Sequence, residues 1–504
     1  MSAEPTILAT VSARAEAEPD RLAVADGTRR LAFGDLAREV RRVARALSAE
    51  PPTGEPAPVA LLVGQDVDAV VGLLGIWQAG RLAVPLDRDQ PAAARDELLA
   101  HAGCRQALIG DHDQGDLPSD VVTVPIGALA GAGVPEPTPP SAAAVDQPAV
   151  VYYTSGTTGR PKGLVISHGA QVLGTRSWCE AYGIGPDDRV ALAFHHSFGA
   201  SRVSQFGALV AGASLHVYDV PRLGLDGFVD AVEDDGITFV HCAPAVLRAV
   251  VDQLAADPGR RRRLSALRTL VLGAEGIRPG DVARFRSVFP PTCTLVYSYA
   301  VSEAGPITAL ALDAAAPVDD APLPVGRPLP GKHVHIAEPD DTGTGEIVVS
   351  GVGLADGYWR DPQRTAARFV SEVDPDGSRR ATFRTGDLGR LRSDGLLEFR
   401  GRSGSLVKLR GYSVDTGLVE NAVVVAMQAR EAVVVVEELH RPRLVAYVVP
   451  GDEPDGRSIP AVRALLAERL PSYMVPAVVV LTDHIPRTTP VSYTHLTLPT
   501  NREV

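Results

Sequence analysis

Tyr153-Thr-Ser-Gly-Thr-Thr-Gly-Arg-Pro-Lys162-Gly163 is the most informative stretch of this sequence. It places four aliphatic hydroxyls, three glycines and one lysine between two apolar runs, residues 149–153 and 164–166, that we predict to be strands. Glycines let backbone N–H groups converge on an anion, hydroxyls add donors, and the lysine supplies charge. We therefore predict a loop that binds a polyphosphate. It is not a Walker loop, because Arg-Pro-Lys follows the second glycine.

A flexible Ser/Thr/Gly turn is the alternative for this stretch, since such turns are common. The use of lysine argues against it, because only three of the 49 basic residues are lysines: Lys162, Lys332 and Lys408. A chain that otherwise uses arginine has kept a lysine at the end of this loop.

Length and composition set the broad class of protein. A chain of 504 residues is too long for one compact core, so we expect two or three units. The net charge of −12, with no basic stripe, argues against nucleic acid as a partner. No secretory signal and no membrane-spanning run are evident, so we expect a cytoplasmic protein. The widely spaced cysteines predict buried thiols in a reducing compartment: Cys104, Cys179, Cys242 and Cys293.

Strand patterns alternate with helical patterns through most of the chain. The predicted strands include residues 58–63, 81–86, 189–194, 214–218, 237–240 and 270–272. Strands separated by helices indicate parallel sheets covered by helices. Residues 432–436, 444–449 and 459–469 predict two further strands and an amphipathic helix. We expect an α/β fold: a large N-terminal domain of helix-covered, mostly parallel sheets (1–400), plus a small C-terminal α+β domain (401–490).

Three further segments repeat the chemistry of the loop: residues 297–305, 383–388 and 401–411. They bring hydroxyls, carboxylates, aromatics and glycines into predicted turns, and each alone is compatible with a structural turn. Together and in this order they closely resemble the adenylate-forming superfamily, which comprises acyl-CoA synthetases, adenylation domains of nonribosomal peptide synthetases, and luciferases. The resemblance covers residues 7–490 and includes Gly75-Ile-Trp-Gln-Ala-Gly80.

The resemblance implies a role for each matching residue. Thr154, Ser155, Gly156, Thr157, Thr158, Gly159 and Lys162 would hold the β- and γ-phosphates of ATP. Gly273, Ala274 and Glu275 would border the adenine, and Tyr299 would stack on it. Ser302, where the family usually has threonine, would contact the α-phosphate, and Glu303 would hold Mg²⁺. Asp387 would bind the ribose hydroxyls, with Arg402 nearby.

The implied reaction has two steps. A carboxylate attacks the α-phosphate, giving an acyl-AMP and pyrophosphate, and a thiol then displaces AMP. Fixed donors, a cation and Mg²⁺ suit this chemistry, because charge shifts among phosphate oxygens. The thiol would belong to coenzyme A or to the phosphopantetheine of a carrier protein, which would act in trans because no carrier domain follows in the sequence.

In this family the small domain rotates between the two steps, and we predict the hinge at residues 401–404. Gly404 stands where the family usually has aspartate or lysine. Glycine allows more backbone conformations than either, so we expect rotation at this hinge to be less controlled. Lys408 matches a family lysine that can face the active site after the rotation. A surface lysine is the alternative.

The end of the sequence departs from the family. A Gly-Lys pair, whose lysine bridges the substrate carboxylate and ATP, is expected shortly after Pro490, and no lysine follows. Residues 491–504 resemble translated sequencing-adapter read-through, so we expect a non-native tail. The alternative is a genuine loss of the catalytic lysine, which would lower the adenylation rate by about 10²–10³.

The substrate pocket is expected around Phe194-His-His-Ser197. Amino-acid-activating relatives carry an aspartate for the substrate's α-amino group where this chain has Ser197. A hydroxyl cannot pair with an ammonium as a carboxylate does, so we expect an acid without an α-amino group. His196 is expected to be a pocket wall, as in the similar segment of luciferases, and a light-emitting oxygenase stays open on this motif.

Two classes of function remain at this stage. The first is an ATP-dependent acid–thiol ligase, with an amino-acid-activating adenylation domain as its variant. The second is a catalytically impaired relative that binds nucleotide without turnover. A dinucleotide site at residues 351–357 is rejected, because its glycine spacing is wrong.

Overall fold

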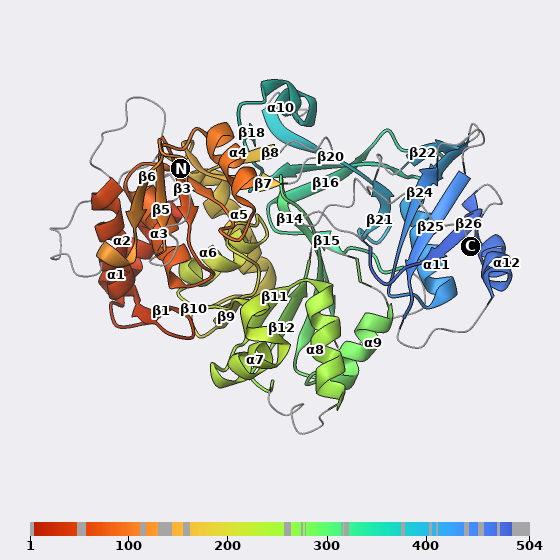
Figure 1. Cartoon of the computed structure of the whole chain (residues 1–504), viewed down its shortest axis with the longest axis horizontal. Helices are drawn as coiled ribbons and strands as arrows, with labels where there is room; N and C mark the ends of the chain where they lie inside the picture. The colour runs from red at the N-terminus through yellow and green to blue at the C-terminus, as the bar shows by residue number, and fades with distance from the viewer. Residues whose placement is uncertain are drawn as a thin grey trace. The chain divides into compact units, whose positions relative to one another are not determined.

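The computed structural model describes most of the chain, in sixteen segments (Figure 1). They are residues 5–47, 57–110, 117–129, 144–154, 162–256, 264–273, 276–277, 279–313, 316, 322–373, 379–402, 406–409, 412–437, 443–451, 458–470 and 474–485. The chain divides into two compact units. Unit 1 comprises residues 1–156, 160–334 and 349–383, and unit 2 comprises residues 157–159, 335–348 and 384–504.

A nine-stranded sheet runs through unit 1 in the order β15-β14-β13-β12-β11-β9-β10-β1-β2. Its central strands are parallel, and β2, β14 and β15 are antiparallel additions. The strands are β1 (Leu22–Ala25), β2 (Arg30–Ala32), β9 (Arg189–Leu192), β10 (Ser214–Val217), β11 (Phe239–Cys242), β12 (Thr269–Leu272), β13 (Thr294–Val301), β14 (Gly305–Leu312) and β15 (Arg327–Pro328).

A seven-stranded sheet has the order β18-β8-β7-β4-β3-β5-β6. The strands are β3 (Pro58–Leu62), β4 (Leu82–Pro85), β5 (Gln106–Ile109), β6 (Val122–Pro125), β7 (Pro148–Thr154), β8 (Lys162–Ser167) and β18 (Gly357–Tyr358). Strands β3 to β7 pair in parallel, whereas β8 pairs antiparallel with β7. Both sheets confirm the predicted mostly parallel architecture.

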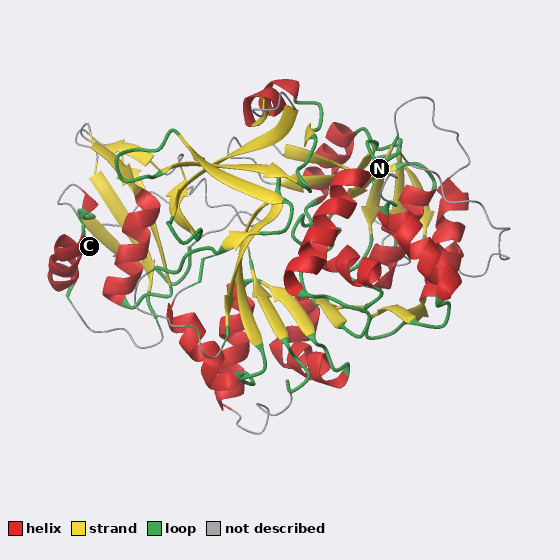
Figure 2. Ribbon diagram, turned by 180° about the vertical axis from the view of Figure 1, so that it is seen from behind, coloured by secondary structure: helices red, strands yellow, loops and turns green. Residues whose placement is uncertain are grey.

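Helices cover these sheets (Figure 2). They are α1 (Ile7–Ala17), α2 (Phe33–Leu47), α3 (Val67–Gln78), α4 (Ala92–Ala102), η1 (Gly127–Leu129), α5 (His168–Tyr182), α6 (Ser201–Ala211), α7 (Val220–Asp234), α8 (Pro244–Ala256), α9 (Pro279–Val288) and α10 (Pro362–Arg368). The largest core joins α1, α2, α3, α5 and α6 to residues of both sheets. The Trp77 indole lies in this core, packs on Phe206 at 4.9 Å between ring centroids, and donates to Ala149 O at 2.7 Å.

The remaining strands form three smaller sheets. A five-stranded sheet contains β16 (Lys332–Ala337), β17 (Gly345–Gly351), β19 (Phe369–Val373), β20 (Arg379–Leu391) and β21 (Leu397–Arg402). The other strands are β22 (Leu406–Leu409) and β23 (Tyr412–Asp415), which form a hairpin, and β24 (Glu431–Glu437), β25 (Arg443–Val449) and β26 (Val478–Leu481), which form a three-stranded sheet. Helices α11 (Thr416–Met427) and α12 (Ile459–Arg469) complete the list.

Unit 2 has its own apolar core, built from α11, α12 and the sheet β24-β25-β26. The predicted strands and helix at residues 432–436, 444–449 and 459–469 are confirmed, and the small α+β domain with them. Gly401 and Arg402, the first two residues of the predicted hinge at 401–404, pair with β20, and the hinge itself stays a prediction. The domain boundary near Gly401 and the tail at 491–504 stay predictions, and the tail lies outside the described residues.

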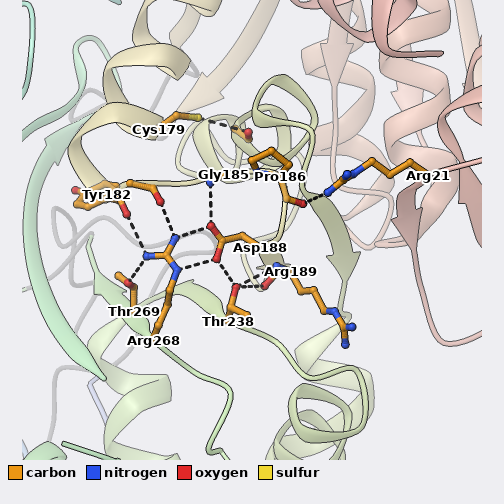
Figure 3. A network of polar contacts seen from close by, with 12 residues as sticks. Arg21, Cys179, Tyr182, Gly185, Pro186, Asp188, Arg189, Thr238, Arg268 and Thr269 are labelled. Carbon is orange, nitrogen blue, oxygen red and sulfur yellow. Dashed lines mark hydrogen bonds and ion pairs between the residues drawn. The ribbon is translucent and has the colours of Figure 1, made fainter. Parts of the chain in front are cut away.

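One carboxylate joins the amino ends of three neighbouring strands of the nine-stranded sheet (Figure 3). Asp188 precedes β9, Thr238 precedes β11 and Arg268 precedes β12. Asp188 accepts from Arg268 Nε at 2.7 Å and Nη2 at 2.6 Å, and from Thr238 Oγ1 at 2.7 Å. The Gly185 amide donates to the same carboxylate at 2.9 Å, so α5 is tied to the network through the loop that follows it.

The Asp188 carboxylate is held ionised by these donors. Burial alone would raise the pKa of Asp188, but the hydrogen bonds from Arg268, Gly185 and Thr238 outweigh burial, so its pKa lies below the ordinary value. A depressed folded-state pKa stabilises the fold above the unfolded pKa, and this stabilisation is lost as pH falls through the folded value.

Asp188→Asn should therefore lower the free energy of unfolding at pH 7 by about 2 kcal/mol, because it removes charge-assisted hydrogen bonds. The measurement is urea denaturation of both proteins between pH 7 and pH 3. The difference should stay constant down to about pH 5 and shrink below about pH 4. Asp187→Asn, whose side chain is fully exposed, is the control. A difference that does not depend on pH would contradict this role for Asp188.

No helix within the described ranges is long and apolar enough to span a membrane.

Candidate functional site

The predicted site residues of unit 1 follow the carboxyl ends of parallel strands. Thr154 ends β7, His196 and Ser197 follow β9, Gly273 follows β12, and Ser302 follows β13. Ligands of open α/β sheets bind beyond the carboxyl ends of the strands. The backbone therefore delivers side chains from distant parts of the sequence to the edges where such sheets bind ligands.

The two ends of the predicted phosphate loop lie opposite each other. Thr154 and Lys162 are a register pair of the antiparallel hairpin β7–β8. The intervening residues 155–161 lie outside the described residues, as do Ala274 and Glu275, so their predicted contacts with ATP stay predictions. Lys408 lies in β22, and its predicted role stays open in the same way.

A tight turn between β13 and β14 carries Ser302 and Glu303. Gly305 closes the turn with φ of +63°, a conformation that favours glycine. Glu303 Oε1 accepts a hydrogen bond from Tyr358 Oη at 2.8 Å, and the Glu303 carbonyl accepts from the Ala355 amide at 2.8 Å. Burial, and then the charge of Glu303, raise the pKa of Tyr358, so its hydroxyl stays a donor. The turn thus holds its carboxylate in a fixed position.

The loop after β9 lies beside this turn. A methyl group placed on Gly199 would lie 3.9 Å from both Cβ and Oγ of Ser302. Close approach at Gly199 brings the predicted substrate segment, with His196 and Ser197, to the residue predicted to contact the α-phosphate. His196 is fully buried, and burial, followed by the nearby His195 and Arg88, lowers its pKa well below the ordinary value.

His241 lies next to Gly273 and was missed by the sequence analysis. A Cβ atom on Gly273 would lie 3.2 Å from His241 Nε2, and the Phe194 ring packs on His241 at 4.8 Å between centroids. His241 Nδ1 is 2.9 Å from Ser204 Oγ, and burial lowers the pKa of His241 to about 4. Its position at the carboxyl end of β11 is the signal that could have identified it.

Two buried cations lie behind the Ser302–Gly305 turn, and the sequence analysis assigned neither of them a role. Lys332 Nζ donates to Ala304 O at 2.6 Å, and the Arg202 guanidinium lies against Gly305 and donates to Gly353 O at 3.4 Å. Their side chains are 6% and 2% exposed. Burial, and then the charge of Arg202, lower the pKa of Lys332 from 10.5 to about 7. The rarity of lysine in the chain was the available signal.

In unit 2, Asp387 and Arg402 are brought together as the sequence predicted. Arg402 Nε donates to Asp387 Oδ1 at 2.8 Å across the β20–β21 pair, and Asp387 is 1% exposed. The Thr385 hydroxyl accepts from the Asp387 amide at 3.0 Å. The contact of Asp387 with a ribose stays a prediction.

Comparison with known proteins identifies the class. Residues 11–359 match the family model of AMP-binding enzymes, and residues 418–490 match the model of the C-terminal domain of these enzymes. The chain therefore belongs to the AMP-binding enzymes, which form the adenylate-forming superfamily that its motifs resemble.

Individual relatives agree with this assignment. The chain is 33% identical over 489 residues to CymA of Salinispora arenicola, a probable nonribosomal peptide synthetase, and the match covers 95% of this chain but only 6% of CymA. Among solved structures, Klebsiella oxytoca NpsA in complex with 3-hydroxyanthranilyl-AMSN shares the fold with a TM-score of 0.84, 22% identity and 96% coverage of each chain. The O-succinylbenzoate coenzyme A synthetase MenE of Bacillus subtilis, in complex with ATP and magnesium, has a TM-score of 0.80, 22% identity, and coverage of 95% and 96%.

Protonation of Lys332 should make the free energy of unfolding depend on pH. Its folded-state pKa lies below the ordinary value, so between about pH 7 and pH 10.5 the unfolded chain binds more protons than the folded one. Raising the pH across this window should therefore stabilise the wild type relative to Lys332→Met, by up to about 1.4 kcal/mol per pH unit.

Thermal unfolding of both proteins at pH 7 and pH 9 measures this effect. His333→Gln, at the exposed neighbouring position, is the control and should show no such trend. A stability difference between wild type and Lys332→Met that is the same at both pH values would contradict the burial of a titrating ammonium.

Proposed function

We propose that this protein activates a carboxylic acid with ATP to an acyl-adenylate and then transfers the acyl group to a thiol. The observation that carries the proposal is the approach of Gly199 to Ser302, which puts a pocket loop beside a turn bearing a fixed carboxylate. Membership of the AMP-binding family supports it. The chain spans only 6% of CymA, so the substrates and partners of such assemblies are part of the proposal and not of the finding.

The residues of the Ser302–Gly305 turn fit the chemistry of Mg²⁺ and ATP. Glu303 Oε1 is bonded to Tyr358, and no hydrogen bond from the described residues reaches Oε2, which leaves that oxygen for a cation. Mg²⁺ typically binds one or two protein carboxylates together with substrate phosphates. The described part of the chain contains no group of three or more His, Cys, Asp or Glu residues that could hold a metal ion.

In this proposal each residue keeps the role that the family resemblance gave it. When bound, Mg²⁺ neutralises charge on the phosphate oxygens. Glu303 would hold the metal and Ser302 would contact the α-phosphate, while the Tyr358 hydroxyl keeps the Glu303 carboxylate in place. The nucleotide contacts are assigned to Thr154, Ser155, Gly156, Thr157, Thr158, Gly159, Lys162, Gly273, Ala274, Glu275, Tyr299, Asp387 and Arg402, and a role in the second step to Lys408.

The acid is proposed to lack an α-amino group. Ser197 stands where amino-acid-activating relatives carry an aspartate, and a hydroxyl offers no charge to an ammonium. The acyl acceptor is coenzyme A or the phosphopantetheine of a carrier protein in trans. An amino-acid-activating domain is the second candidate, favoured by the likeness to nonribosomal peptide synthetases, and an impaired nucleotide-binding relative is the third.

Pyrophosphate exchange across a panel of aryl, fatty and amino acids separates these three. Exchange with acids that lack an α-amino group supports the proposal, and exchange with amino acids alone supports the second candidate. ATP binding without exchange for any acid, in a protein whose C-terminal sequence has been verified, would leave only the third.

Glu303→Gln should lower the exchange rate by about 10²-fold or more, and it should raise the Mg²⁺ concentration needed for half-maximal activity, because a neutral amide binds Mg²⁺ poorly. Glu16→Gln, at an exposed position of α1, is the matched control and should leave both values unchanged. An unchanged Mg²⁺ dependence in Glu303→Gln would remove Glu303 from the proposed metal site.

A further inference from the structure

The loop after β9 holds two adjacent histidines, His195 and His196, whose hydrogen positions can be deduced from their neighbours. A neutral imidazole has one donor and one acceptor nitrogen, and the partner of one nitrogen decides the state of the other. Backbone groups have no such freedom, because an amide N–H only donates and a carbonyl only accepts. Both rings of this loop are bonded directly or indirectly to backbone groups.

The ring of His196 is oriented by Gln65. Gln65 Nε2 donates to Phe194 O at 2.8 Å, and the His196 amide donates to Gln65 Oε1 at 2.8 Å. These two backbone groups fix the orientation of the Gln65 side-chain amide. In the flipped orientation its NH₂ group would face the His196 N–H and its oxygen would face the Phe194 carbonyl, and neither pair can form a hydrogen bond. Gln65 Oε1 also lies 3.2 Å from His196 Nδ1, so Nδ1 carries the proton.

His196 Nε2 is consequently a bare acceptor. It is buried and has no hydrogen-bond partner among the described residues. A buried polar atom without a partner is unfavourable and rare in native proteins, so each case calls for an explanation. A ligand that donates a hydrogen bond to Nε2 provides one.

The second ring makes Ser197 an acceptor as well. The Ser197 amide donates to His195 Nδ1 at 3.3 Å, so Nδ1 carries no proton, and Nε2 carries it on the side of Asp87 Oδ1, 4.0 Å away. Ser197 Oγ lies 2.8 Å from the same Nδ1 and therefore donates its own proton to it. Toward a ligand, the Ser197 hydroxyl can therefore only accept a hydrogen bond, through the lone pairs of Oγ.

The charges that act on His196 itself favour an uncharged donor over a cation, whereas Asp87, Asp89 and Asp219 act in the opposite sense on the adjacent His195 ring. His195 and the Arg88 guanidinium both disfavour positive charge at His196. The Asp87 carboxylate lies 4.0 Å from His195 Nε2. An ammonium placed at His196 Nε2 would meet a neutral acceptor and a nearby cation, whereas a hydroxyl or an aromatic amine meets no such penalty.

We propose that the acid activated by this protein carries an uncharged hydrogen-bond donor, a hydroxyl or an aromatic amino group, which binds His196 Nε2 and Ser197 Oγ. The inference rests on the proposed function and narrows its substrate class. Because Gly199 of the same loop lies beside Ser302, the donor belongs near the carboxylate that reacts at the α-phosphate.

Matched acids test the proposal. Each set contains a hydroxyl, a methoxy and an unsubstituted member: 2-hydroxybenzoate, 2-methoxybenzoate and benzoate, and the corresponding 2-substituted hexanoates, with 2-aminobenzoate added. We expect kcat/KM in pyrophosphate exchange to be about 10- to 100-fold higher for the donor-bearing acids, because the other members leave the acceptors unpaired.

His196→Phe keeps an aromatic ring and removes the acceptor. It should lower kcat/KM for donor-bearing acids by about tenfold or more relative to the unsubstituted acids, so that the preference within each set is lost. His168→Phe is the matched control, since His168 is also buried, has a pKa lowered by burial to about 4, and packs edge-on against Trp77 at 5.3 Å. The control should keep the wild-type preference.

Calorimetric binding of the same acids in the presence of MgATP separates the inference from the proposed function. A preference for donor-bearing acids that His196→Phe abolishes supports the inference even where no exchange occurs. Equal binding within each set, a preference for the methoxy or unsubstituted members, or binding of no donor-bearing acid would overturn it. An equal loss for all acids in His196→Phe would reduce His196 to a structural residue.

Discussion

The Asp188 carboxylate ties together the amino ends of β9, β11 and β12, three neighbouring strands of the nine-stranded sheet, through its hydrogen bonds with Thr238 and Arg268. Parallel strands share one direction, so fixing their amino ends also fixes the edge at which their carboxyl ends emerge. His196, His241 and Gly273 emerge at that edge. A network at the amino ends of these strands thus helps to fix the positions of residues at the opposite edge of the sheet.

The site is built from polar groups that the fold alone would not favour. Lys332 and Arg202 are buried beside each other behind the Ser302–Gly305 turn, and His196 Nε2 has no hydrogen-bond partner among the described residues. Desolvated charges and unpaired acceptors destabilise a folded protein. Their concentration around one loop and one turn distinguishes this region from the apolar core behind it, where the Trp77 indole has its partner.

The fold class and the main motifs could be predicted from the sequence because their signals are local. Alternating strands and helices, the glycines of the turns and the ordered motifs all lie within short stretches of chain. The roles of Gln65 and Arg202 could not be predicted, because they depend on contacts across the fold: Gln65 and His196 are 131 residues apart, and Arg202 and Gly353 are 151 residues apart. The pocket roles of residues 155–159 rest on the family resemblance alone.

The division of the chain bears on recombination between related enzymes. Unit 2 takes strand residues 335–348 from the middle of the chain and residues 384–504 from its end. Within it, Thr385 Oγ1 donates to Ile347 O at 2.7 Å, and Glu346 binds Arg384 at 2.6 Å. A chimaera that exchanged only residues 384–504 would pair strands from two different parents. Grafts that carry residues 335–348 together with 384–504 keep these partners matched.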